Sequence, residues 1–216
     1  MKQPGTCTLI SLVIPVYNSE KTLADVVARL RLTLTSLGKA YNYQIILVND
    51  GSRDGVAKVC HSLALEDDRI VFLNLSRNYG QSNAIMAGFH EATGDYVICL
   101  DDDGQNPPEE IPKLLHAIEN SDFDVIYGRC KKQQALHRNL GSHLNAYMAR
   151  VMIDKPATLE LSSFFIAKRF VVKTAMEYGN PFPYLIGLFR GITGKIGNFD
   201  VRHEPRRIGM SNYRSE

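Results

Sequence analysis

The chain has 216 residues, of which 44% are hydrophobic, so it can bury one substantial core. Its length favours a single domain that spans residues 1–216. Its 25 basic and 23 acidic side chains nearly cancel, which argues against nucleic acid as a partner. The four cysteines form no CxxC pair, which argues against a disulfide framework. The stretch before the first strand-like segment is too short for a signal peptide, and no run of about 18 apolar residues could span a membrane. These features favour a cytoplasmic protein.

The first two predicted elements are a strand and a helix. Residues 8–16, TLISLVIPV, are apolar and β-branched, which predicts a buried strand. Apolar residues recur at helical spacing from Leu23 to Leu34, and Gly38 stands where such a helix ends. The same alternation predicts strands at 44–50, 70–76, 95–100, 124–129 and about 195–204, and helices after Asp54, at 81–92, after Pro108, and at about 137–153 and 168–178. It predicts an α/β fold with a mainly parallel sheet and helices on both faces.

Polar sequences follow four of the predicted strands. They read PVYN, VNDGS, LSRNYG and LDDDGQ. In open α/β sheets ligands bind beyond the carboxyl ends of the strands, so we expect these four segments to converge on one site.

The most specific local feature is the acidic triplet Asp101, Asp102 and Asp103, which directly follows an apolar strand. Alternate carboxylates at a strand exit can bind one divalent cation from the same side, and that cation could bridge a diphosphate. The alternative is a solvated acidic turn. Three adjacent carboxylates repel one another unless a cation or hydrogen-bond donors compensate, so the position favours a metal site.

Two further segments allow a functional and a structural interpretation. Asp50 lies in the turn NDGS, where Gly51 allows a ligand to approach the backbone, although a simple turn aspartate is the alternative. Gly80, Ala84 and Gly88 recur every four residues, and for them we favour close packing of a helix on the sheet.

A polar cluster lies near the end of the sequence, in VRHEPRRIGMSNY. Its arginines could bind phosphate oxygens through forked donors, and a solvated basic strand edge is the alternative. Arg129, at the end of a predicted strand, is expected to face the same crevice, whereas Arg138 could equally lie on the surface. The cluster contains Arg202, His203, Arg206, Arg207, Ser211 and Tyr213.

The order VIPVYN, VNDGS, NYGQSNAIMAGF, LDDDGQNPPEE and HEPRRIGMSNY resembles the inverting family 2 glycosyltransferases. The resemblance spans essentially the whole chain. It is closest to the branch that loads sugars onto polyprenyl phosphate, which includes the dolichol-phosphate mannose synthases and the bacterial undecaprenyl-phosphate glycosyltransferases. It implies a GT-A fold, with a donor and metal-binding half at 1–128 and an acceptor-side half at 129–216.

The resemblance also implies roles for individual residues. Pro15, Tyr17, Glu20 and Asp50 would line the nucleoside pocket. Asp101 and Asp103 would bind a divalent metal, Mg²⁺ or Mn²⁺, and together with Asp102 and Gln105 they would contact the donor. Arg129, His203, Arg206 and Ser211 would face the donor diphosphate or the acceptor phosphate, and the expected catalytic residues are Asp101, Asp103, Arg129 and Arg206.

Three positions depart from the family pattern. Ser19 stands where many members carry glutamate, with Glu20 next to it. Asn212 replaces the usual lysine, and the segment SSFFIAKR at 162–169 lacks the acidic and arginine residues that the pattern places there. These departures affect the assignment of the acceptor more than that of the donor.

The expected reaction moves a sugar from a UDP- or GDP-sugar to a polyprenyl phosphate with inversion. A hydroxyl acceptor is the first alternative and would need a carboxylate base, for which Asp102 and Glu160 are the candidates. A nucleotidyltransferase and a non-catalytic nucleotide-sugar-binding module are more distant alternatives. The family usually continues into hydrophobic membrane helices, so we expect such a segment beyond Glu216, which would hold the domain at the cytoplasmic face of the membrane, with an oligomer as a further possibility.

Overall fold

A computed structural model of the chain describes residues 7–130, 159–179 and 183–205. Its strands form one seven-stranded sheet in the order β3-β2-β1-β4-β6-β5-β7. The strands are β1 Thr8–Val16, β2 Tyr41–Asn49, β3 Ile70–Asn74, β4 Tyr96–Cys99, β5 Val125–Cys130, β6 Phe165–Lys168 and β7 Ile196–Val201. The helices are α1 Leu23–Ser36, α2 Val56–Glu66, α3 Gln81–Glu91, α4 Ile111–Glu119, α6 Arg169–Met176 and α7 Leu185–Ile192, with the 3₁₀ turn η1 at Pro108–Glu110.

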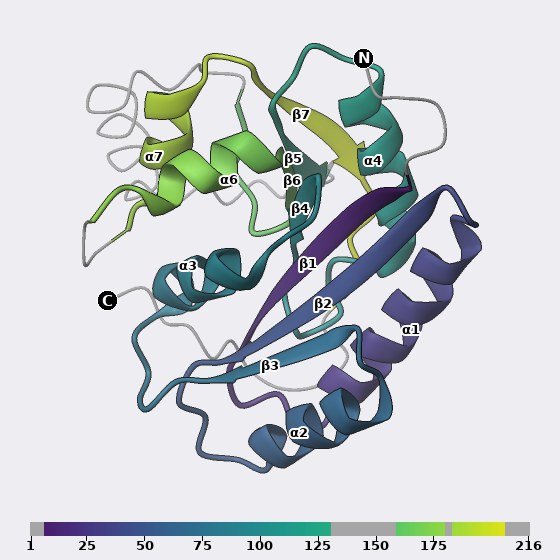
Figure 1. Ribbon diagram of the computed structural model, residues 1–216, viewed down its shortest axis with the longest axis vertical. Helices are drawn as coiled ribbons and strands as arrows, with labels where there is room; N and C mark the ends of the chain where they lie inside the picture. Colours follow the sequence, from purple (N-terminus) through teal and green to yellow (C-terminus); the bar gives the residue numbers. More distant parts are fainter. Residues whose placement is uncertain (1–6, 131–158, 180–182, 206–216) are drawn as a thin grey trace.

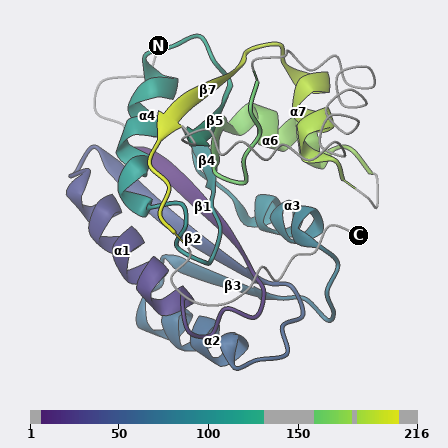
Figure 2. The same cartoon turned by 180° about the vertical axis from the view of Figure 1, so that it is seen from behind.

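The molecule has three layers. Helices α1, α2 and α4 cover one face of the sheet, and α3, α6 and α7 cover the other (Figures 1 and 2). Each face has its own cluster of buried apolar side chains. Because both faces are covered, the central strands are almost continuously apolar, as the sequence predicts for a sheet between two helical layers.

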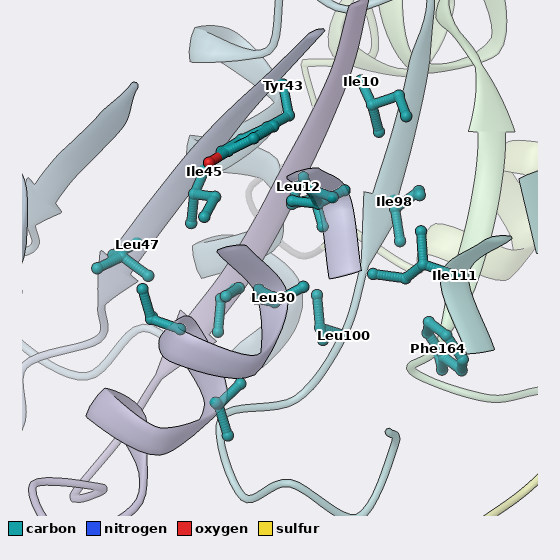
Figure 3. Packing of buried hydrophobic residues seen from close by; sticks show 14 of the residues in the cluster. Ile10, Leu12, Leu30, Tyr43, Ile45, Leu47, Ile98, Leu100, Ile111 and Phe164 are labelled. Atoms are coloured by element: carbon teal, nitrogen blue, oxygen red, sulfur yellow. The ribbon is translucent and has the colours of Figure 1, made fainter. Parts of the chain in front are cut away.

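The larger cluster joins the sheet to α1 and α4. Leu12 of β1 and Ile98 of β4 lie beside Leu30 of α1 and Ile111 of α4 (Figure 3), and all four are fully buried. Each such side chain contributes about 1.5–3 kcal/mol when removed from water. This packing fixes the ends of β1 and β4, which carry the site.

Close packing of α3 on the sheet confirms the interpretation of its small residues. A Cβ atom on Gly88 would lie 2.4 Å from Cγ1 of Val13, so a larger residue would push the helix off β1. Ala84 is fully buried. Gly80 differs, because no atom lies within 4 Å of its would-be Cβ and its φ of +90° instead allows the sharp entry into the helix.

The predicted elements that lie within the described residues agree with the structure in type, and β1 agrees at both ends. The stretch at 137–153 lies outside the described residues. The sequence patterns do not indicate β6 or α7, because β6 has four residues and α7 contains two glycines, Gly187 and Gly191, which weaken the helical signal. Strand β6 is also antiparallel to both its neighbours, β4 and β5.

Two expectations from composition can be compared with the described residues. All four cysteines are free thiols. Within the ranges that the structure describes, no helix combines the length and the apolar character needed to cross a membrane.

Candidate active site

The polar ends of the first four strands converge, as the sequence predicts. The backbone amide of Tyr17, after β1, donates to Oδ2 of Asp102, after β4, at 2.9 Å. The amide of Asn18 donates to the Ser52 hydroxyl, after β2, at 3.0 Å. Gln81, which follows β3 and begins α3, donates through Nε2 to Oδ1 of Asp101 at 2.8 Å. One edge of the sheet therefore gathers all four segments.

Asp50 anchors the loop between β3 and α3. Its carboxylate accepts the backbone amides of Tyr79 at 2.7 Å and Gly80 at 3.0 Å, and the residue is fully buried. Burial raises the pKa of Asp50, while the two amides oppose that rise. In this conformation the carboxylate holds the 77–80 loop in place, and its contact with a nucleoside stays a prediction.

Gly51 allows this loop to close over Asp50. Its φ is +63°, and a Cβ atom would lie 2.3 Å from the carbonyl carbon of Arg77 and 2.4 Å from the amide nitrogen of Asn78. Both contacts are with backbone, which cannot move aside as a side chain can. The glycine in NDGS is therefore needed for its φ and for the close approach of the loop.

The remaining residues predicted for the nucleoside pocket lie around the end of β1. Pro15 is buried and Tyr17 is half-buried. Glu20 is exposed, and its Oε2 accepts the amide of Gly55 at 3.1 Å. Ser19, at the position where many family members carry glutamate, is only 7% exposed. Glu20 therefore ties the segment after β1 to the turn before α2.

The three carboxylates of the acidic turn have different surroundings. Asp101 accepts hydrogen bonds from the side chains of Gln81, Asn106 and Ser163. The bond from Nδ2 of Asn106 measures 3.0 Å. Asp102 turns to the segment after β1, and Asp103 accepts the amide of Gln105 through Oδ1 at 3.0 Å.

The surroundings of Asp102 favour the protonated form of its carboxyl group. Burial raises its pKa to about 6 against the opposition of the Ser19 hydroxyl and the Tyr17 amide, and the neighbouring carboxylates Asp101 and Asp103 add to the rise. The hydroxyl of Thr22 also donates to the backbone carbonyl of Asp102 at 2.9 Å. Asp102 thus joins the acidic turn to the start of α1.

The segment after β7 lies against the acidic turn. The amide of Glu204 donates to the carbonyl oxygen of Gln105 at 2.8 Å. His203, next to it, is exposed. Arg202 pairs with Glu110 at 2.6 Å. Arg206 and Ser211, the other residues predicted for phosphate binding, lie outside the described residues, as do Arg138, Arg207, Asn212 and Tyr213.

Arg129 has an ionic partner on the neighbouring strand. Its Nη2 lies 2.7 Å from Oδ1 of Asp200, and β5 and β7 pair in parallel with these two residues in register. Both side chains are about one third exposed. The guanidinium is therefore held at the carboxyl end of β5, and its contact with a substrate phosphate stays a prediction.

Comparison with known proteins identifies the family. Residues 11–182 match the family model described as Glycosyl transferase family 2. The chain belongs to glycosyltransferase family 2.

Curated relatives and solved structures agree with membership of glycosyltransferase family 2. The chain is 36% identical to the undecaprenyl-phosphate 4-deoxy-4-formamido-L-arabinose transferase of Shewanella sediminis over 99% of this chain and 64% of the relative. It is also 36% identical to the protein of the same name from Yersinia pestis, over 94% of this chain and 62% of the relative. The chain thus spans just under two thirds of the length of these relatives.

The solved structures establish the fold of this family 2 glycosyltransferase domain. Mannosyl-3-phosphoglycerate synthase from Rubrobacter xylanophilus superimposes with a TM-score of 0.68 at 16% identity, over 93% of this chain and 68% of that one. Glucosyl-3-phosphoglycerate synthase from Mycobacterium tuberculosis, in complex with Mn²⁺, UDP and phosphoglyceric acid, gives 0.63 at 19% identity, over 92% and 72%. The fold is the GT-A fold that the sequence resemblance implies.

The acidic turn of this family 2 domain carries oxygen-bearing side chains of the kind that hard divalent cations prefer. Asp101, Asp103 and the side chain of Gln105 offer oxygen atoms within one turn. In the part of the chain that the structure describes, no group of three or more histidine, cysteine, aspartate and glutamate residues could hold a metal by itself. Magnesium in nucleotide-dependent enzymes is commonly held by one or two carboxylates together with substrate phosphates, so the residues fit a cation that binds with the donor.

Sequence reasoning missed the residues that surround Asp101. Gln81 and Asn106 stand inside segments that the family resemblance uses, but their spacing does not indicate a contact with the acidic turn. Ser163 could be found only from the register of β6, which the sequence did not predict. The pairing of Arg129 with Asp200 was missed for a related reason, because it depends on which strand lies beside β5.

Proposed function

We propose that this domain transfers a sugar from a UDP- or GDP-sugar to a polyprenyl phosphate, with inversion at the anomeric carbon. The observation that carries the proposal is the hydrogen bond from Glu204 to Gln105, because it brings the segment that leads to Arg206 and Ser211 against the acidic turn. The names of the curated relatives support the acceptor, since both are undecaprenyl-phosphate sugar transferases.

The donor is proposed to lie along the strand ends. Pro15, Tyr17, Glu20 and the loop anchored by Asp50 would hold the nucleoside, and the acidic turn would face its diphosphate. Support comes from the glucosyl-3-phosphoglycerate synthase of similar fold, which has been crystallised with Mn²⁺ and UDP. Asp101 and Asp103 would hold a divalent cation here, with Gln105 beside them. When bound, such a cation neutralises the charge that develops on the departing nucleoside diphosphate.

The reaction is a single displacement. An oxygen of the acceptor phosphate forms a bond to the anomeric carbon while the bond from that carbon to the donor diphosphate breaks, and its electron pair leaves with the nucleoside diphosphate. Attack from the side opposite the leaving group inverts the configuration. The enzyme contributes mainly by holding both substrates in line.

A phosphate acceptor reduces the need for a general base. The second ionisation of a phosphomonoester lies near pH 6, so the acceptor arrives largely deprotonated at neutral pH. It therefore needs positioning more than proton abstraction. Arg129 at the end of β5 and His203 after β7 are proposed to supply it, with Arg206 and Ser211.

Donor turnover tests the proposal. The protein is incubated with Mn²⁺ or Mg²⁺ and a panel of UDP- and GDP-sugars, which includes nucleotide-linked 4-deoxy-4-formamido-L-arabinose, with and without undecaprenyl phosphate. The nucleoside diphosphate released is measured. We expect release that requires both metal and lipid. Asp103→Ala should reduce the rate at least about 100-fold, whereas the matched variant Asp68→Ala, which removes an exposed carboxylate before β3, should leave it unchanged.

The other outcomes separate the alternatives. Equal release without the lipid would overturn the lipid acceptor in favour of a hydroxyl acceptor or water, and would direct attention to Glu160, which is exposed before β6. Binding of a nucleotide-sugar without product under any condition would support a non-catalytic binding module instead.

A further inference from the structure

Ser163 lies opposite Asp101, just beyond the paired ends of the neighbouring strands β6 and β4. Strand β6 runs antiparallel to β4 with Phe165 opposite Cys99. Two residues further along this register Ser163 comes opposite Asp101, and its hydroxyl donates a hydrogen bond to Oδ2 of that carboxylate. Ser163 belongs to the segment 162–169, which reads SSFFIAKR.

Two other side chains also donate hydrogen bonds to this carboxylate. Gln81 donates to Oδ1 at 2.8 Å, and Asn106 donates to Oδ2 at 3.0 Å. The three donors come from three separate places in the fold: the start of α3, the turn before η1 and the segment before β6. Asn106 is only 6% exposed, so its amide is fixed by packing as well as by this bond.

The chemistry of these donors matters for the site. A carboxylate bound from both of its oxygens cannot rotate about its terminal torsion without breaking hydrogen bonds. Gln81, Asn106 and Ser163 are neutral, so their hydrogen bonds orient the Asp101 side chain without placing a positive charge beside it. Residues that orient a metal-binding carboxylate in this way tune its affinity for the metal.

We infer that Ser163, together with Gln81 and Asn106, is a positioning residue that fixes the Asp101 carboxylate for the divalent cation and the donor diphosphate. The inference rests on the proposed function. It gives the segment 162–169 a donor-side role, although this segment lies in the half of the chain expected to serve the acceptor.

The test measures the binding of Mn²⁺ in the presence of UDP and, separately, of GDP, through the paramagnetic resonance signal of free Mn²⁺. The thermal unfolding midpoint of each variant is measured alongside. Ser163→Ala should raise the apparent Kd for Mn²⁺ about 10-fold or more. Ser163→Thr, which keeps the hydroxyl, should restore most of the affinity. Ser162→Ala is the matched control, because the Ser162 hydroxyl accepts the amide of Phe164 and contacts no residue of the acidic turn in the described contacts.

A second variant keeps the test decisive if Ser163→Ala fails to fold. Gln81→Ala removes the donor on the opposite oxygen of Asp101 from the partly exposed start of a helix, and it should weaken Mn²⁺ binding in the same way. The inference is overturned if folded Ser163→Ala or Gln81→Ala binds Mn²⁺ as tightly as the parent, or if Ser162→Ala is weakened equally. If the parent itself binds no Mn²⁺ with either UDP or GDP, the proposed function fails too, so the two failures are distinguishable.

Discussion

Arg29 of α1 reaches Glu204, which follows β7, with Nη2 of the arginine 3.1 Å from Oε1 of the glutamate. The same guanidinium contacts Glu109 at 2.7 Å, and its side chain is 14% exposed. Because the amide of Glu204 also binds the acidic turn through Gln105, Arg29 clamps the segment before Arg206 between α1 and that turn.

Removal of this clamp should affect the acceptor more than the donor. We predict that Arg29→Ala lowers the free energy of unfolding by about 1–3 kcal/mol, as loss of a charged hydrogen-bond donor does, and raises the KM for polyprenyl phosphate. Urea unfolding and steady-state kinetics measure both. Lys39→Ala, an exposed cation after the same helix, is the control. A drop in stability with an unchanged acceptor KM would show that the clamp only holds the fold together.

A comparison of Gly51 with Gly38 tests how tightly the 77–80 loop packs over Asp50. Both have positive φ, +63° and +76°, but only Gly51 would place a Cβ against backbone. We predict that Gly38→Ala costs about 1–2 kcal/mol from its φ alone, and that Gly51→Ala costs at least about 1–3 kcal/mol more from the clash with the 77–80 loop. Urea unfolding of both variants gives the difference. Equal losses would mean that the loop shifts freely.

Asp67 should make the fold sensitive to acid. Hydrogen bonds from Arg69, opposed by burial, lower the pKa of this carboxyl, and Arg31 adds an ion pair at 3.1 Å. A lowered folded-state pKa stabilises the protein above the ordinary value of about 4 and loses that contribution as the pH falls through the folded-state pKa. Asp67→Asn should therefore be less stable by about 1–3 kcal/mol at pH 7, and the gap to the parent should shrink below about pH 4.

Unfolding titrations from pH 7 to pH 2.5 or so measure this gap. The neighbouring exposed residue supplies the control, Asp68→Asn, which should change the free energy of unfolding by less than about 0.5 kcal/mol at pH 7. A gap that stays constant down to the lowest pH would contradict the assignment to the Asp67 carboxyl.

Arg129 provides a kinetic test of the acceptor site. Arg129→Ala should raise the KM for polyprenyl phosphate about 10-fold or more while the donor KM changes less than about 2-fold, since a lost charged contact to phosphate is worth more than about 1.4 kcal/mol. Stability should change by less than about 1 kcal/mol, because the pair with Asp200 is exposed to water.

The variant Asp200→Asn distinguishes the effect of losing the ion pair from the effect of losing the Arg129 guanidinium. It removes the carboxylate but keeps the guanidinium, so its acceptor KM should stay within about threefold of the parent value. An equal rise in the donor and acceptor KM of Arg129→Ala would move this arginine to the donor diphosphate.

Local patterns predicted the first half of the fold and the convergence of its strand ends. The apolar strands, the helical spacing in α1 and the polar sequence after each strand are all encoded within short windows. The acidic turn could be found for the same reason. The hydrogen-bond partners of Asp101 could not be predicted. Ser163 is positioned by an antiparallel strand whose four residues carry no periodic signal, and neither segment alone specifies which strands pair in the sheet.

The burial of individual acidic residues also could not be predicted from residue type. Asp50 and Glu20 both suit a nucleoside pocket by sequence, yet the structure buries Asp50 under the 77–80 loop and leaves Glu20 exposed beside Gly55. Asp102 likewise matches its neighbours in type but faces the segment after β1. Such differences depend on packing between elements, which a motif does not specify.

The position of β6 has a consequence for synthesis on the ribosome. Among the described residues, strand β5 pairs only with β6 and β7, and β4 has β6 as its second neighbour. Until Phe165 has been made, the nascent chain therefore presents β4 as an open edge and β5 without a partner in this sheet, a state that favours chaperone contact and misassembly. The sheet closes only when distant parts of the chain meet, so we expect slow folding for a domain of this size, and a fragment that stops at Cys130 should aggregate when expressed alone.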